Sequence, residues 1–112
     1  MIAVITAGLI AAASSSAHTE SYKSTITIKH EDGSSVYKGR VISSLESCER
    51  NRTVKLHTSE GAVIAETTTN ENGRWRYEFI GARYYATVTR RVIDSGQHHH
   101  VCLPDRSPTT PT

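Results

Sequence analysis

The chain has 112 residues, which suffices for one domain with a single hydrophobic core. It carries 13 Lys and Arg against 11 Asp and Glu, a formal net charge of +2, and these charges are scattered along the sequence. This balance excludes the concentrated basic stripe that is typical of nucleic-acid-binding domains, so no nucleic-acid partner is expected.

The first segment, residues 1–17, is predicted to be the helix of a cleaved signal peptide. Apolar and small residues run almost without interruption from Ile2 to Ala13, and Ser15 and Ala17 match the small-x-small pattern of a signal-peptidase site. The run is shorter than the roughly 20 apolar residues that a transmembrane helix needs. No Lys or Arg precedes it, which leaves the true start codon open. We expect a secreted protein that begins near His18.

Beyond the leader, alternation with period two predicts short β-strands, and no helical periodicity is present. His18 to Ser21 is expected to be a short polar arm. In the strand that follows, Ser24 and Ile26 share one face, while Lys23 and Lys29 lie on the other.

Turn residues recur about every 8 to 12 residues and separate about seven expected strands. The predicted ranges are 22–30, 36–45, 53–58, 62–69, 74–80, 84–92 and 98–103. Gly39 indicates a bulge or a close approach of another backbone. Val54 and Leu56 are expected to face inward, and Val63, Ala65 and Thr67 are expected to share one face of their strand. We therefore predict an all-β antiparallel sandwich, of the immunoglobulin or transthyretin type, over residues 18–103.

The segment RWRYEFI alternates rings with charges. Trp75, Tyr77 and Phe79 fall on one face and are expected in the core, because so small a domain has few other large residues to fill one. An exposed aromatic platform for sugars is the alternative. Arg74 and Arg76 lie on the opposite face.

Candidate binding residues are Tyr84, Tyr85, Arg74, Arg76 and Arg90. Adjacent residues in a strand face opposite sides, so one of the two tyrosines is expected at the surface. The arginines could form a basic patch that docks a cell-wall polymer, a phospholipid head group or nucleic acid. The alternative is a solvated outer face in which nearby acids pair with them across strands. These acids are Glu66, Glu71 and Glu78.

The C-terminal residues, 104–112, are rich in Pro and Thr and are predicted to be an extended tail rather than part of the core. The two cysteines, Cys48 and Cys102, suggest one disulfide if the domain is exported. Two unpaired thiols in a reducing compartment are the alternative.

Several residues together resemble a small secreted β-sandwich domain of actinobacteria, which looks like the carboxypeptidase regulatory-like or transthyretin-like family. The marks are Tyr37-x-Gly39-x-Val41-x-Ser43, Cys48, Arg52-x-Val54-x-Leu56, Thr68-x-x-x-x-Gly73-x-Trp75, Tyr84-Tyr85-Ala86-x-Val88, Cys102 and Arg106-Ser107. The resemblance covers about Thr25 to Ser107. It implies about seven strands in two sheets, a Cys48–Cys102 bridge and no catalytic residues. The run His98-His99-His100 departs from the pattern.

That histidine run suggests a metal site, since zinc and copper bind imidazole at neutral pH. In an extended segment only His98 and His100 can converge, and the candidate third ligand is His57 or His30. No paired ligand motif supports the site, so a solvated strand edge is the expectation and no cofactor is predicted.

No nucleophile elbow or phosphate-binding glycine loop is present, and we expect no enzymatic activity. The sequence instead predicts a noncatalytic secreted module with a structural or binding role, whose partner is a cell-envelope component or another protein. Two alternatives are an exported metal-binding protein that uses the His98–His100 segment, and a secreted inhibitor or interaction module. The inhibitor would bind through an edge strand, although Lys23 and Lys29 are typical of a protected edge.

Overall fold

The computed structural model describes residues 18–111, so the predicted signal helix lies outside the described residues. Apart from one turn of 3-10 helix, η2 (Glu46–Cys48), the regular structure in these residues is β. The strands are β1 (His18–Tyr22), β2 (Ser24–Ile26), β3 (Lys29–His30), β4 (Val36–Ser43), β5 (Thr53–Thr58), β6 (Val63–Thr68), β7 (Arg74–Glu78), β8 (Tyr84–Val88), β9 (Arg91–Ser95), β10 (His98–Cys102) and β11 (Asp105–Arg106).

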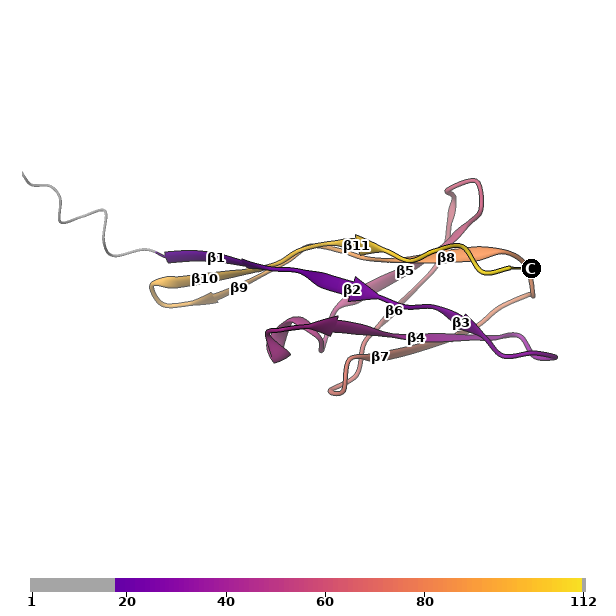
Figure 1. Ribbon diagram of the computed structural model, residues 1–112, viewed down its shortest axis with the longest axis horizontal. Coiled ribbons are helices and arrows are strands. Elements are labelled where there is room, and N and C mark those ends of the chain that lie inside the picture. The colour runs from indigo at the N-terminus through magenta and orange to yellow at the C-terminus, as the bar shows by residue number, and fades with distance from the viewer. Residues whose placement is uncertain (1–17, 112) are drawn as a thin grey trace, which may run out of the picture.

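Two sheets form the layers of a sandwich-like body (Figure 1). One has the strand order β11-β8-β5-β6 and is antiparallel throughout. In the other, β4 is the central strand and pairs antiparallel with β2, β3 and β7. The prediction of an all-β domain built from antiparallel sheets is confirmed.

A third sheet, of order β1-β10-β9, projects from one end of this body and is called the extension (Figure 1). β9 and β10 are antiparallel, whereas β1 runs parallel to β10. Two predictions are therefore wrong. His18 to Ser21 is paired strand rather than a polar arm, and the predicted strand 84–92 is divided into β8 and β9 where the chain passes from one sheet to another.

The core lies between the two layers. Its buried side chains are Ile26, Tyr37, Val41, Val54, Leu56, Trp75, Tyr84, Ala86 and Val88. Tyr77 and Phe79 pack against them, which confirms that the ring-bearing face of RWRYEFI is core. Fully burying one large apolar side chain stabilises a fold by about 1.5–3 kcal/mol. A core of this size thus holds the two sheets together.

The predicted face of β6 is wrong in part, because the strand contains a bulge. The β5–β6 register pairs Leu56 with Ala65 but His57 with Val63, so that Ile64 is the extra residue. Ile64 and Ala65 both pack against the core, while Val63 is left 53% exposed. A strict period of two cannot continue through such a bulge.

The C-terminal segment is extended, as its composition predicts, but it packs onto the body. β11 pairs with β8, and beyond it the amides of Ser107 and Thr110 donate to Ala86 O and Tyr84 O, each at 2.8 Å. Both side chains are buried. Asp105 Oδ2 accepts a hydrogen bond from the amide of Ile26 at 2.9 Å, which joins the β11 edge to the opposite sheet.

Candidate functional site

Basic residues lie directly opposite one another on neighbouring strands of the β4 sheet. Lys38 on β4 is in register with Lys29 on β3 and with Arg76 on β7. Arg40 on β4 is in register with Arg74 on β7. Like charges directly opposite each other destabilise a sheet. Packing alone therefore does not explain why two rows of like charge occur in this sheet.

The alternation of the strands turns these basic side chains away from the core. On β7, Trp75 is buried, whereas Arg74 and Arg76 on either side of it are exposed. On β4, buried Tyr37 and Val41 fix the same alternation. The cations therefore share the outer face of this sheet, and the apolar residues between them hold the strands in place.

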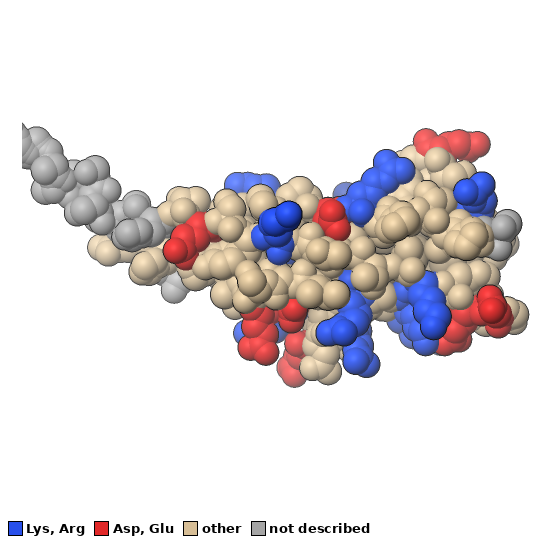
Figure 2. Space-filling view, viewed as in Figure 1, with Lys and Arg blue, Asp and Glu red and all other residues tan. Residues whose placement is uncertain are grey.

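These residues line a groove of about 640 Å³, which we call the basic groove. Its lining holds all five basic residues of the two rows, no acidic residue among those described, and polar residues that include Thr67, Thr68 and Asn70. Figure 2 shows Lys and Arg gathered along the lower margin of the molecule, in the region of β4 and β7, with acidic residues to either side. The groove is thus a cationic surface with acidic flanks.

The two rows differ in how far acids neutralise them. Lys38 Nζ lies 2.7 Å from Glu31 Oε2, and Arg76 Nη1 lies 3.1 Å from Glu78 Oε2. The hydrogen bond from Lys38, together with its charge, lowers the pKa of Glu31. Arg40 and Arg74 form no ion pair with any described residue.

Arg40 and Arg74 are therefore the cations most available to an incoming anion. A guanidinium offers a planar fork that can hold a phosphate or carboxylate through two parallel hydrogen bonds. The guanidiniums of Arg40 and Arg74, in register on adjacent strands, can bind one oxyanion group from both sides. Lys29 adds a third positive charge, on β3.

Close backbone packing fixes the floor of the basic groove. A Cβ atom on Gly39 would lie 1.8 Å from Thr27 O, so only glycine fits. Thr27 O also accepts a hydrogen bond from Trp75 Nε1 at 3.2 Å, and the Thr27 amide donates to Arg40 O at 2.9 Å. The close approach of another backbone that Gly39 indicated is confirmed.

The binding residues predicted from sequence are brought together only in part. Arg74 and Arg76 line the basic groove, whereas Arg90 is exposed between β8 and β9 and does not. Of the acids that could pair with these arginines, Glu78 binds Arg76, and it does so along one strand rather than across strands.

The prediction that one of the two adjacent tyrosines is exposed is wrong, because both are buried. Tyr84 is in the core, and its hydroxyl donates to Ile80 O at 2.7 Å. Tyr85 faces the other side of the sheet, where the ring of His57 stacks on it at 4.6 Å and the Arg106 guanidinium lies 3.8 Å from its ring centroid. Arg106 comes from the segment that was predicted to be a tail.

The histidines considered for a metal site do not converge. His57 belongs to β5, where it contacts Tyr85 and Thr87, whereas His98 and His100 belong to the extension. The rings of His98 and His100 are 6.2 Å apart. Within residues 18–111, no group of three or more His, Cys, Asp or Glu side chains is placed to hold a metal ion.

The edge strand considered for a protein partner is β2 with β3. One amide of β2 is already bonded to Asp105 of the C-terminal segment. This hydrogen bond protects part of the edge, and its acceptor belongs to residues 104–112, which the sequence predicted to be a tail outside the core.

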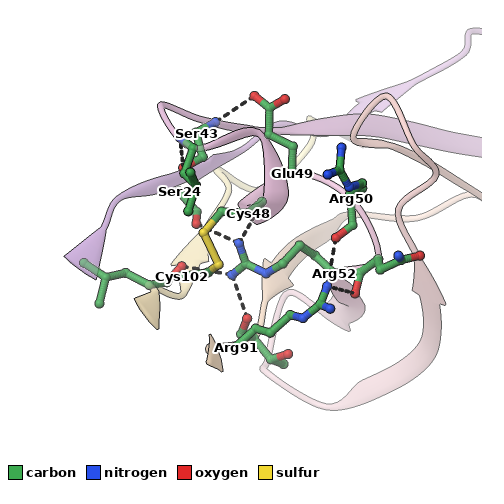
Figure 3. The surroundings of a disulfide bond; sticks show 12 residues. Ser24, Ser43, Cys48, Glu49, Arg50, Arg52, Arg91 and Cys102 are labelled. Carbon is green, nitrogen blue, oxygen red and sulfur yellow. Dashed lines mark hydrogen bonds between the residues drawn. A yellow bond between two sulfur atoms is a disulfide. The ribbon is translucent and has the colours of Figure 1, made fainter. Parts of the chain in front are cut away.

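Cys48 and Cys102 form a disulfide that ties η2 to the end of β10 (Figure 3). Beside it lies Arg52, the largest fully buried side chain among the described residues. One terminal nitrogen of its guanidinium donates to Cys48 O and Ser24 Oγ, and the other donates to Thr89 O and Leu103 O. Burial lowers the pKa of this guanidinium, and the charge of nearby Arg91 acts in the same direction.

Sequence reasoning missed Lys29, Lys38 and Arg40 as site residues. Each stands in a strand that was predicted, and a signal was available in the alternation of Lys38 and Arg40 on one face. What the sequence could not supply was the register that places them opposite Arg74 and Arg76.

No protein-family model matches this chain, and neither a curated protein nor a solved structure matches it. Within residues 18–111, no helix has the length and apolar character that crossing a membrane requires.

Proposed function

We propose that this protein is a noncatalytic, secreted binding module that holds an anionic ligand in the basic groove. The observation that carries the proposal is the Arg40–Arg74 pair, two cations in register on adjacent strands with no ion pair to any described carboxylate. An anion bound between them would remove their mutual repulsion, so that ligand binding and sheet stability are coupled.

Secretion is supported by the apolar run before Ser15 and by the Cys48–Cys102 bridge, because disulfides persist mainly in oxidising compartments. Intact mass of protein recovered from the culture medium of its host, with and without reduction, tests it. We expect a mature chain that begins near His18 and has no thiol open to labelling before reduction. A retained leader with both thiols labelled directly would contradict this.

The sequence frame of the carboxypeptidase regulatory-like or transthyretin-like domains supports a distant kinship with that family. Its marked positions have physical reasons here. Gly39 has no space for a Cβ, and Gly73 has φ of 77° and would place a Cβ 2.7 Å from Val41 O. Arg52 is buried among carbonyl oxygens. These are requirements of the fold, and the kinship carries no ligand or activity to this chain.

Binding of inorganic polyphosphate, measured by isothermal titration calorimetry, tests the anionic-ligand proposal. We expect the double variant Arg40→Gln/Arg74→Gln to weaken binding at least tenfold, because charge-assisted hydrogen bonds from two guanidiniums are lost. The affinity of the unaltered protein should also fall as salt concentration rises.

The matched control is Arg90→Gln/Arg83→Gln, which removes the same charge at exposed positions outside the basic groove. This control should retain most of the affinity. Equal weakening by both double variants would mean that net charge alone attracts the polymer, and the site would be rejected.

A further inference from the structure

The basic groove has a second kind of lining, which is polar and uncharged. Asn70 Oδ1 accepts hydrogen bonds from the amides of Asn72 and Arg74, at 2.9 and 3.0 Å, which leaves the side-chain N–H groups of Asn70 for another partner. Thr67 and Thr68 are adjacent in β6 and therefore face opposite sides of the strand. Thr67 pairs with buried Val54, whereas Thr68 is exposed and its hydroxyl forms no hydrogen bond within residues 18–111. Donors and acceptors for uncharged hydroxyl groups therefore stand beside the arginines.

The size of the groove points to a ligand larger than a single oxyanion. Its volume of about 640 Å³ lies within the range of about 300–1,000 Å³ that small-molecule sites occupy. The Lys38–Arg76 row and the Arg40–Arg74 row are two residues apart along β4, a separation of about 7 Å. Two separated rows of cations suit a ligand with repeated negative charges.

The groove lacks what single-stranded nucleic acid requires. Sequence-tolerant binding of unpaired strands depends on exposed aromatic rings on which the bases stack. Trp75 is the one aromatic residue among the lining residues, and it is 3% exposed. Hydroxyl-bearing units between the phosphates fit this lining better than bases.

We infer that the ligand of the basic groove is a phosphodiester polymer of polyol or sugar units. Its phosphates would contact the two basic rows, and its hydroxyls would exchange hydrogen bonds with the Thr68 hydroxyl and the Asn70 amide. This inference rests on the proposed function, because it names the class of anion that the arginines hold.

Titration of the full chain with a glycerol phosphate oligomer and with inorganic polyphosphate of equal charge tests the inference. We expect the oligomer to bind more tightly than polyphosphate. Removing the Thr68 hydroxyl, in Thr68→Val, should weaken binding of the oligomer about fivefold and leave polyphosphate binding unchanged. Valine keeps the β-branched shape that suits a strand, so the fold should persist.

The possible outcomes separate the inference from the proposed function. If Thr68→Val binds both polymers as the unaltered protein does, the hydroxyl contact is absent and only this inference fails. If Arg40→Gln/Arg74→Gln retains the affinity for both polymers, the two proposals fail together. Tighter binding of a thymidine oligonucleotide of equal charge would overturn the polyol assignment without use of any variant.

Discussion

The Arg52 guanidinium donates a hydrogen bond to the carbonyl oxygen of Cys48 at 2.6 Å, directly beside the Cys48–Cys102 disulfide. Through its other bonds the same side chain reaches Thr89, where β8 gives way to β9, and Leu103, which follows β10. Arg52 thus holds the point at which the chain leaves the sandwich for the extension. No described carboxylate forms an ion pair with it, so backbone carbonyls and one hydroxyl stabilise its charge.

Replacing Arg52 with methionine should lower the free energy of unfolding by about 3 kcal/mol or more. The substitution leaves one buried and two partly buried carbonyl groups without the donors that they have in the native fold, and methionine cannot replace these donors. Urea denaturation followed by tryptophan fluorescence measures the change through Trp75. The control Arg90→Met lies at an exposed position and should stay within about 0.5 kcal/mol of the unaltered protein. Equal stability of the two variants would show that the Arg52 bonds add nothing.

Removing the disulfide, in Cys48→Ser/Cys102→Ser, should destabilise the fold by about 4 kcal/mol in the chain-entropy model. The two cysteines are 54 residues apart in sequence, so the bridge closes a large loop of the unfolded chain. The same measurement with the unaltered protein in reductant should give a matching loss. If reduction left the unfolding midpoint unchanged, the bridge would not contribute to the stability of the fold.

Much of the fold was predictable because local alternation records which side of a strand is buried. Val54, Leu56 and Trp75 are buried as their spacing predicts. The register between distant strands leaves no such trace, so the placement of Lys38 opposite Arg76 could not be found in this way. The candidate site depends on register, and only its two β7 residues were predicted.

Contacts between residues far apart in the chain are a second feature that the sequence did not reveal. Arg52 belongs to a polar stretch of sequence, yet it is fully buried because four surrounding segments offer it oxygen acceptors. Tyr85 faces away from the core, and Arg106 covers its ring. In both cases the partners lie far along the chain, where neither composition nor periodicity could indicate them.

Gly39→Ala should destabilise the protein by more than about 2 kcal/mol, because a Cβ only 1.8 Å from Thr27 O forces backbone to move. The same shift would disturb the floor of the basic groove and weaken polyphosphate binding. Gly81→Ala is the matched control, since its Cβ would meet its nearest neighbour at 3.9 Å and no positive φ is involved. Comparable thermal unfolding of the two alanine variants would rule out a steric requirement at Gly39.

Glu31→Gln should raise the affinity of the basic groove for polyphosphate about twofold, because it frees Lys38 from an exposed ion pair. Since Lys38 lowers the pKa of Glu31, the carboxylate stays ionised at neutral pH and is neutralised only as pH falls through this lowered pKa. The affinity advantage of the variant should therefore be present near pH 7 and disappear in acid. Calorimetric titrations at both pH values measure it, and an advantage independent of pH would exclude this ion pair as its cause.

The buried hydroxyl of Tyr84 makes the stability of the fold depend on pH in the alkaline range. Burial raises the pKa of its hydroxyl, and the nearby Tyr37 adds to the effect. The folded protein therefore retains this proton at a pH where the unfolded chain, with a pKa of about 10, has begun to lose it. The stability that Tyr84 supplies is complete below that pH and is lost as pH rises through the raised pKa.

Tyr84→Phe should unfold with a weaker dependence on pH above about 10, because the phenylalanine ring has no proton to lose. At neutral pH the variant should be less stable by about 1 kcal/mol, since the hydrogen bond to Ile80 O is gone. Urea denaturation at neutral pH and at several alkaline pH values separates the two effects. Parallel stability curves for the two proteins across the alkaline range would mean that Tyr84 ionises as freely in the fold as in the unfolded chain.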